Sequence, residues 1–280
     1  MYSTLISADV LREHADRPGW IVLDARFRLD DPEAGRRAWR EGHIPGSRYV
    51  HLDEDLSSPV TPSSGRHPLP DPERLASTFG ALGIGDDCQV VVYDDAGGSI
   101  AARAWWLLRA LGHDTVAVLD GGLQAWQEAG DALDTAAPEV VPRDFTPRPR
   151  SDLALDASSL RRALRARAVL VDVREPERFE GRREPIDAIA GHVPGAVNLP
   201  WRANVDERGR FRSAAALRAR HEAMLGGRPP ESAVFMCGSG VTACHGLLAM
   251  EHAGLHGARL YAGSWSEWIR DPARPVVTGP

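Results

Sequence analysis

The sequence predicts an α/β protein built as a tandem duplication, in which each domain is a parallel sheet with helices on both faces. Short valine-rich runs alternate with segments of helical periodicity along the 280 residues, and this order is typical of parallel sheets. Three landmarks also recur in the same order in both halves of the chain, which indicates an internal repeat.

The first half carries start signals for two helices and one buried strand. Ser7 can cap the first helix, and Asp71 with Pro72 marks the start of the second. The run of valines within residues 89–93 is typical of a central strand. We therefore expect helices over residues 8–14, 71–82 and 100–111, a short helix around Trp126, and strands over residues 20–24, 89–93 and 116–119.

The second half repeats this order. The apolar run over residues 233–236 predicts another buried strand, and the segment that follows it has the periodicity of a helix. We expect helices over residues 158–166, 214–225 and 241–252, and strands over residues 169–172, 233–236 and 259–261.

The recurring landmarks are short motifs at strand ends and turns. They are Asp24-Ala25-Arg26 and Asp172-Val173-Arg174, Gly42-His43-Ile44-Pro45-Gly46 and Gly191-His192-Val193-Pro194-Gly195, and a glycine turn followed by Trp126 or Trp265. The Asp–Arg pairs and both histidines are most simply packing residues. The repeat predicts a first domain over residues 1–130, a Pro- and Ala-rich linker over residues 131–152, and a second domain over residues 153–280.

Composition and charge restrict the partners and the compartment. The chain is 43% hydrophobic and 26% charged with a net charge of -6, values that suit a soluble globular protein and disfavour a nucleic-acid partner. Its N-terminus lacks the pattern of a signal peptide, and no apolar run is long enough to span a bilayer. Three cysteines are too few for a disulfide framework. We expect a cytoplasmic protein without a membrane or nucleic-acid partner.

The loop after strand 233–236 holds a candidate nucleophile. Cys237 is followed by Gly238, Ser239 and Gly240, and then by the helical segment. Glycines let several backbone N–H groups point at the sulfur, and the positive end of the helix dipole lies close to it. Both effects favour the thiolate, the nucleophilic form of cysteine. The alternative is an inert core cysteine, which is how we interpret Cys244.

The repeat is broken at this position. When the halves are aligned on the strand before the loop, Asp94 of the first half stands opposite Cys237 of the second. A carboxylate cannot carry a sulfur atom. The first domain is therefore expected to be a catalytically silent scaffold, and the second the catalyst.

These motifs together resemble the two-domain sulfurtransferases of the rhodanese family over nearly the full length of the chain. The resemblance implies a tandem duplication of a rhodanese-like domain. It also implies that the reactive cysteine begins a loop of six residues in the second domain. That loop is Cys237, Gly238, Ser239, Gly240, Val241 and Thr242.

The amino-acid sequence of this loop is similar to that of 3-mercaptopyruvate sulfurtransferases. Gly238 and Ser239 carry no charge, which favours a monoanionic α-keto acid over dianionic thiosulfate. The resemblance implies that Arg178 binds the substrate carboxylate. The second arginine of the family falls near Ile186 and is absent, with Arg182 or Arg183 as its candidate replacement.

The resemblance also implies a proton relay and a reaction. Ser239 matches the serine of a Ser-His-Asp relay, His67 its histidine and Asp55 its aspartate. Cys237 would take sulfur from 3-mercaptopyruvate or thiosulfate as a persulfide and pass it to a thiol such as thioredoxin, or to cyanide. No metal and no organic cofactor is expected.

Four other functions compete with this hypothesis. A phosphatase loop needs arginine where the chain has Ala243. A dinucleotide fingerprint is matched only formally by Gly238, Gly240 and Ala243. A thiosulfate-preferring enzyme and a non-catalytic sulfur-binding interaction module stay open as alternatives.

Overall fold

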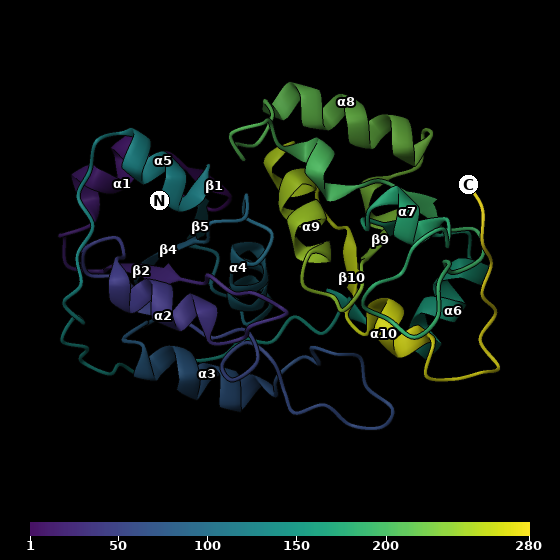
Figure 1. Ribbon diagram of the computed structural model, residues 1–280, viewed down its shortest axis with the longest axis horizontal. Helices are drawn as coiled ribbons and strands as arrows, with labels where there is room; N and C mark the ends of the chain where they lie inside the picture. The colour runs from purple at the N-terminus through teal and green to yellow at the C-terminus, as the bar shows by residue number, and fades with distance from the viewer. The chain divides into compact units, whose positions relative to one another are not determined.

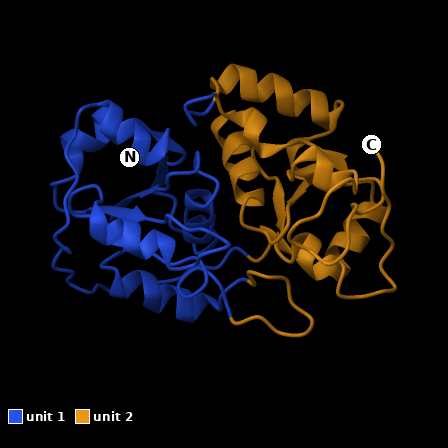
Figure 2. Ribbon diagram, in the orientation of Figure 1, with its two compact units in different colours: residues 1–58, 69–150, 207–211 blue, residues 59–68, 151–206, 212–280 orange.

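The computed structural model describes residues 1–280, which divide into two compact units. Unit 1 contains residues 1–58, 69–150 and 207–211, and unit 2 contains residues 59–68, 151–206 and 212–280 (Figure 2). Residues 59–68 therefore pack with unit 2, although they precede most of unit 1 in the sequence.

Unit 1 holds a five-stranded parallel sheet with strand order β1-β5-β4-β2-β3 (Figure 1). Its strands are β1 (Leu5–Ile6), β2 (Trp20–Asp24), β3 (Arg48–Tyr49), β4 (Gln89–Tyr93) and β5 (Val116–Leu119). Its helices are α1 (Ala8–His14), α2 (Ala34–Glu41), α3 (Pro72–Ala81), α4 (Ala101–Ala110) and α5 (Gly122–Glu128).

Unit 2 repeats this topology with the order β6-β10-β9-β7-β8, again all parallel. Its strands are β6 (Ala154–Leu155), β7 (Val169–Asp172), β8 (Val197–Asn198), β9 (Ala233–Met236) and β10 (Arg259–Tyr261). Its helices are α6 (Ala157–Arg165), α7 (Pro176–Phe179), α8 (Ala214–Leu225), α9 (Ala243–His252) and α10 (Ser264–Trp268), with short 3-10 turns η1 (Trp201–Asn204) and η2 (Pro230–Ser232). The predicted duplication of a parallel-sheet domain is confirmed.

Each unit has one sheet, and both faces of that sheet are buried. In unit 1, Val91 and Tyr93 of β4 pack with Leu11 of α1 and Trp126 of α5. Because side chains alternate along a strand, Val90 points to the opposite face, where α4 packs on β4 and β5.

Unit 2 has the same layers. Met236 and Tyr261 pack with Leu160 of α6 and Trp268 of α10. On the other face α9 packs on β9 and β10, and α8 packs on α9. Burial on both faces explains why the central strands are almost uniformly apolar.

The strand register places the two loops of interest at equivalent positions. Asp24 of β2 pairs with Tyr93 at the end of β4, and Asp172 of β7 pairs with Met236 at the end of β9. The next residue is Asp94 in unit 1 and Cys237 in unit 2. Both loops therefore leave the carboxyl end of the corresponding central strand, where ligand sites of parallel sheets usually form.

The Asp-x-Arg landmarks are buried ion pairs that repeat in both units. Arg26 bonds to Asp24 at 2.6 Å and to the Gly42 carbonyl. Arg174 bonds to Asp172 at 2.7 Å and to a glycine carbonyl in the corresponding turn. The guanidinium thus ties the strand end to the Gly-His turn, and these landmarks hold the scaffold together.

The sequence did not predict the four edge strands β1, β3, β6 and β8, each of which has only two residues. So short a segment carries no alternation of side chains. The segment over residues 131–152 has no helix, and its backbone bonds to unit 1, where the Arg143 N–H donates to the Gly80 carbonyl at 2.9 Å. No helix has both the length and the apolar character needed to cross a membrane.

Candidate active site

Cys237 follows β9 directly, and its side chain is 4% exposed. Its backbone N–H donates to Ser264 Oγ at 3.1 Å, and its carbonyl accepts from the Trp265 N–H at 3.0 Å. The Gly238 carbonyl accepts from the Ser266 N–H at 2.8 Å. The first turn of α10 therefore holds the start of the loop in place.

Gly240 turns the loop back over the sulfur. Its N–H donates to Cys237 Sγ at 3.2 Å, and its φ of +81° lies in the left-handed region. A Cβ at this position would lie 2.2 Å from the Ala262 carbonyl oxygen. Only glycine fits, so the predicted N–H donor to the sulfur depends on this residue.

Helix α9 begins at Ala243, and the loop leads straight into its N-terminus. The positive end of the helix dipole favours negative charge on a sulfur that lies before that first turn. Cys244 lies inside the helix, is fully buried, and donates its S–H to the Gly240 carbonyl at 3.3 Å. The two neighbouring cysteines thus have different surroundings, and only Cys237 lies in the loop.

The structure brings two of the three relay residues together. His67 Nδ1 and Ser239 Oγ are joined by a hydrogen bond of 2.7 Å, and both side chains are buried. Asp55 belongs to unit 1, where its carboxylate accepts from the His51 N–H at 2.7 Å. Burial raises the pKa of Asp55. Its part in the relay stays a prediction.

Arg178 of α7 is fixed by two buried carboxylates. Its Nε donates to both oxygens of Glu184 at 3.0 Å, and its Nη2 donates to Asp187 at 2.9 Å. Burial alone would raise the pKa of Glu184, but hydrogen bonds from Arg178 and from backbone N–H groups outweigh it and hold that pKa below its usual value. A Cβ on Gly238 would lie 3.5 Å from Arg178 Nη2, so the guanidinium lies beside the loop.

Arg182 and Arg183 are placed differently. Both are exposed, and Arg182 pairs with Glu180. The second guanidinium beside Gly238 belongs to Arg66, whose Nη2 would lie 3.1 Å from a Cβ on that glycine. Arg66 was not among the residues predicted from the sequence. The available signal was its position next to His67.

The loop of unit 1 is filled by a carboxylate. Asp94 is fully buried and accepts four backbone N–H bonds, from Ala96, Gly98, Ile100 and Ala101, at 2.8–2.9 Å. These donors belong to the loop and to the first turn of α4. Burial raises the pKa of Asp94 in spite of these four bonds, and N–H groups thus hold a carboxyl group where unit 2 has the sulfur.

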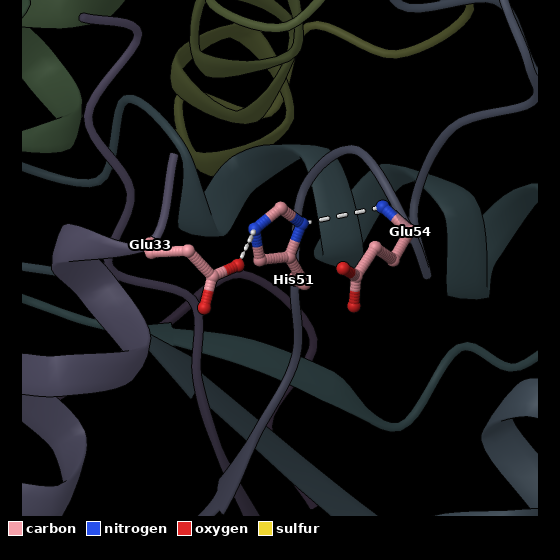
Figure 3. Close-up of side chains that lie close together, drawn as sticks. All are labelled: Glu33, His51 and Glu54. Carbon is pink, nitrogen blue, oxygen red and sulfur yellow. Dashed lines mark hydrogen bonds and ion pairs between the residues drawn. The ribbon is translucent and has the colours of Figure 1, made fainter. Parts of the chain in front are cut away.

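One cluster in unit 1, Glu33, His51 and Glu54, has the composition of a metal site (Figure 3). His51 Nδ1 accepts the N–H groups of Asp53 and Glu54, and Nε2 faces the Pro32 carbonyl at 3.1 Å. A metal needs a free lone pair on one of these nitrogens. Since both nitrogens are used, the cluster is a network of hydrogen bonds around the buried His51 ring, with Glu33 and Glu54 exposed.

The duplicated parallel-sheet units, with a cysteine loop after the central strand of unit 2, define a tandem rhodanese-like protein. Residues 7–129 and 156–271 both match the rhodanese-like domain family. The chain belongs to the rhodanese family.

Its relatives include sulfurtransferases with two different donor names. The chain is 49% identical to a probable 3-mercaptopyruvate sulfurtransferase of Pseudomonas aeruginosa, over 98% of both chains. It is 42% identical to a putative thiosulfate sulfurtransferase, SseB, of Mycobacterium tuberculosis, over 92% of this chain and 90% of that one. The crystal structure of SseA from Escherichia coli, described as a 3-mercaptopyruvate enzyme, superposes with a TM-score of 0.81 at 32% identity and covers 95% of this chain and 100% of that chain.

Proposed function

We propose that the chain is a sulfurtransferase that carries sulfur from 3-mercaptopyruvate to a thiol as a persulfide on Cys237. One observation carries the proposal: the Cys237 sulfur accepts a loop N–H just before the N-terminus of α9, and the half-buried Arg178 guanidinium lies beside the next residue. The nucleophile and an N–H donor therefore belong to one loop, and a group suited to bind a carboxylate lies next to it. Membership of the rhodanese family supports the reaction class.

In the first half-reaction the Cys237 thiolate attacks the thiol sulfur of the donor. The new S–S bond forms as the C–S bond breaks, and the electron pair of that bond passes to carbon as the enolate of pyruvate. The proton of the donor thiol must then reach the methylene carbon, and the persulfide keeps the negative charge. Loop N–H groups stabilise that charge.

Ser239 and His67 are suited to move this proton. They form one hydrogen bond in a buried setting next to Cys237, which is the geometry that proton transfer requires. In the second half-reaction a thiolate attacks the outer sulfur and regenerates Cys237. We propose a cytoplasmic dithiol such as thioredoxin as the acceptor, because a thiolate nucleophile and three free cysteines suit a reducing compartment.

The surroundings of Cys237 favour the keto acid over thiosulfate. Gly238 and Ser239 add no positive charge, and the charge of Arg178 is matched by Glu184 and Asp187. Such a site has N–H donors that can bind a planar carboxylate, but little net positive charge to attract a dianion. Thiosulfate stays the alternative donor, as the name of the mycobacterial relative indicates.

The test is to incubate the protein with each donor and weigh it intact. We expect a gain of one sulfur atom that is lost in Cys237→Ser and kept in Cys88→Ser, a matched change of a buried cysteine in unit 1. Initial rates should be higher with 3-mercaptopyruvate. A chain that gains no sulfur from either donor would contradict the proposal, and faster reaction with thiosulfate would reverse the donor assignment.

A further inference from the structure

Arg66 reaches the active-site loop from the segment of residues 59–68, which packs with unit 2. Its backbone N–H donates to Ser266 Oγ at 3.0 Å. The preceding Gly65 lies so close to α10 that a Cβ there would be 2.5 Å from the Gly263 carbonyl oxygen. The same helix start also holds the backbone of Cys237 and Gly238, so the segment and the loop share one support.

One buried carboxylate positions Arg66 and Arg178 together. Arg66 Nη1 donates to Asp187 Oδ1 at 2.6 Å, and Arg178 Nη2 donates to Asp187 Oδ2 at 2.9 Å. The Asp187 side chain is only 4% exposed. A carboxylate that bridges two guanidiniums fixes their separation. Because Nε of Arg178 donates to Glu184, its remaining nitrogen is Nη1.

The unused donors of both arginines lie beside the reactive cysteine. Arg66 Nε is buried without a hydrogen-bond partner, which is an unfavourable state for a charged donor. From the position of a Cβ on Gly238, Arg66 Nη2 would be 3.1 Å away and Arg178 Nη1 3.7 Å away. Arg66 and Asp187 also line a pocket of about 400 Å³ together with Ile186 and Ser266, so a small molecule can reach Arg66 from this side.

We propose that Arg66 is the second arginine that binds the carboxylate of the sulfur donor, in partnership with Arg178. This inference rests on the proposed function and names the residue that takes the place of the arginine missing at Ile186. Two guanidiniums held by one carboxylate match the two oxygens of a monoanion. Because Asp187 and Glu184 balance their charge, the site distinguishes a carboxylate by geometry.

The test compares glutamine variants of four arginines in steady-state assays with 3-mercaptopyruvate. We expect Arg66→Gln to raise KM about tenfold to a hundredfold, as for the loss of a charged hydrogen bond, with a smaller change in kcat. The inhibition constant of pyruvate should rise by the same factor. Arg182→Gln and Arg183→Gln should leave both constants unchanged. Arg162→Gln, on the exposed face of α6, is the matched control.

Two results would overturn the inference. One is an unchanged KM and pyruvate constant in a folded Arg66→Gln protein, whose unfolding midpoint is measured alongside. The other is a rise of KM in Arg182→Gln or Arg183→Gln in its place. Calorimetric titration with pyruvate separates this question from the proposed function. If pyruvate binding depends on Arg66 but the protein transfers no sulfur, the proposed reaction is refuted and the inference about the carboxylate site still holds.

Discussion

Replacing Ser239 by alanine should affect the rates of sulfur transfer from the two donors differently, because only one of the reactions needs a proton transfer. Sulfur transfer from 3-mercaptopyruvate releases an enolate, which must receive a proton at carbon. Transfer from thiosulfate releases sulfite, which needs none. If Ser239 and His67 move the proton, Ser239→Ala slows the first reaction and leaves the second nearly unchanged.

The magnitude follows from the hydrogen bond that is lost. The contact of 2.7 Å between Ser239 and His67 is buried on both sides. Positioned proton transfer contributes about a hundredfold to ten-thousandfold to a rate. At the lower end of this range, the expected loss is about a hundredfold, or about 2.7 kcal/mol. The folded state should lose about 1–3 kcal/mol, because the substitution removes one partner of a buried hydrogen bond.

The assay is single-turnover formation of the persulfide, followed by intact mass at saturating concentrations of each donor. Ser158→Ala, an exposed serine on α6, serves as the control for handling. Equal slowing with both donors would refute the reasoning, because it would mean that Ser239 only orders the loop. An unchanged rate with 3-mercaptopyruvate would remove Ser239 from the proton path.

Two further predictions concern buried carboxylates. Asp94→Asn should lower the free energy of unfolding by about 2–3 kcal/mol, measured by urea titration of fluorescence, because the amide can accept only two of four N–H bonds; a change below about 0.5 kcal/mol, within the range of ordinary surface substitutions, would contradict the N–H cradle. The lowered pKa of Glu184 stabilises the fold above its usual value of 4.5, and this contribution should be lost as pH falls through the lowered pKa. Glu184→Gln should therefore be less stable at pH 7 and lose less stability between about pH 5 and pH 3, and parallel pH profiles of the two proteins would argue against it.

Much of the fold could be predicted because its signals are local. Valine runs, helix start residues and repeated turns mark elements one at a time, and the duplication confirms each by its copy. The edge strands have no such signal, because pairing with a neighbour alone defines two residues as β3 (Arg48–Tyr49) or β8 (Val197–Asn198).

The candidate site was predictable only where the chain is continuous. The glycines of the loop from Cys237 to Thr242 indicate its backbone turn directly from the sequence. Arg66 could not be found in this way, because its place depends on a segment that leaves unit 1 and packs on α10. Long-range packing of this kind has no period and no motif. Comparison with a family position by position finds a functional residue only when it occupies the same position in the sequence, and Arg66 lies far from the position of the missing arginine near Ile186.

The side chain of Asp94 can be compared with a persulfide on Cys237 in the other loop. Its oxygens are separated from Cα by the same number of bonds as the outer sulfur of a cysteine persulfide. Unit 1 therefore displays a charged end group of nearly the length of the reaction intermediate, enclosed by four N–H donors at 2.8–2.9 Å. The loop around Asp94 can therefore serve as a reference for the shape of the persulfide state, to which the loop around Cys237 can be compared before and after it accepts sulfur.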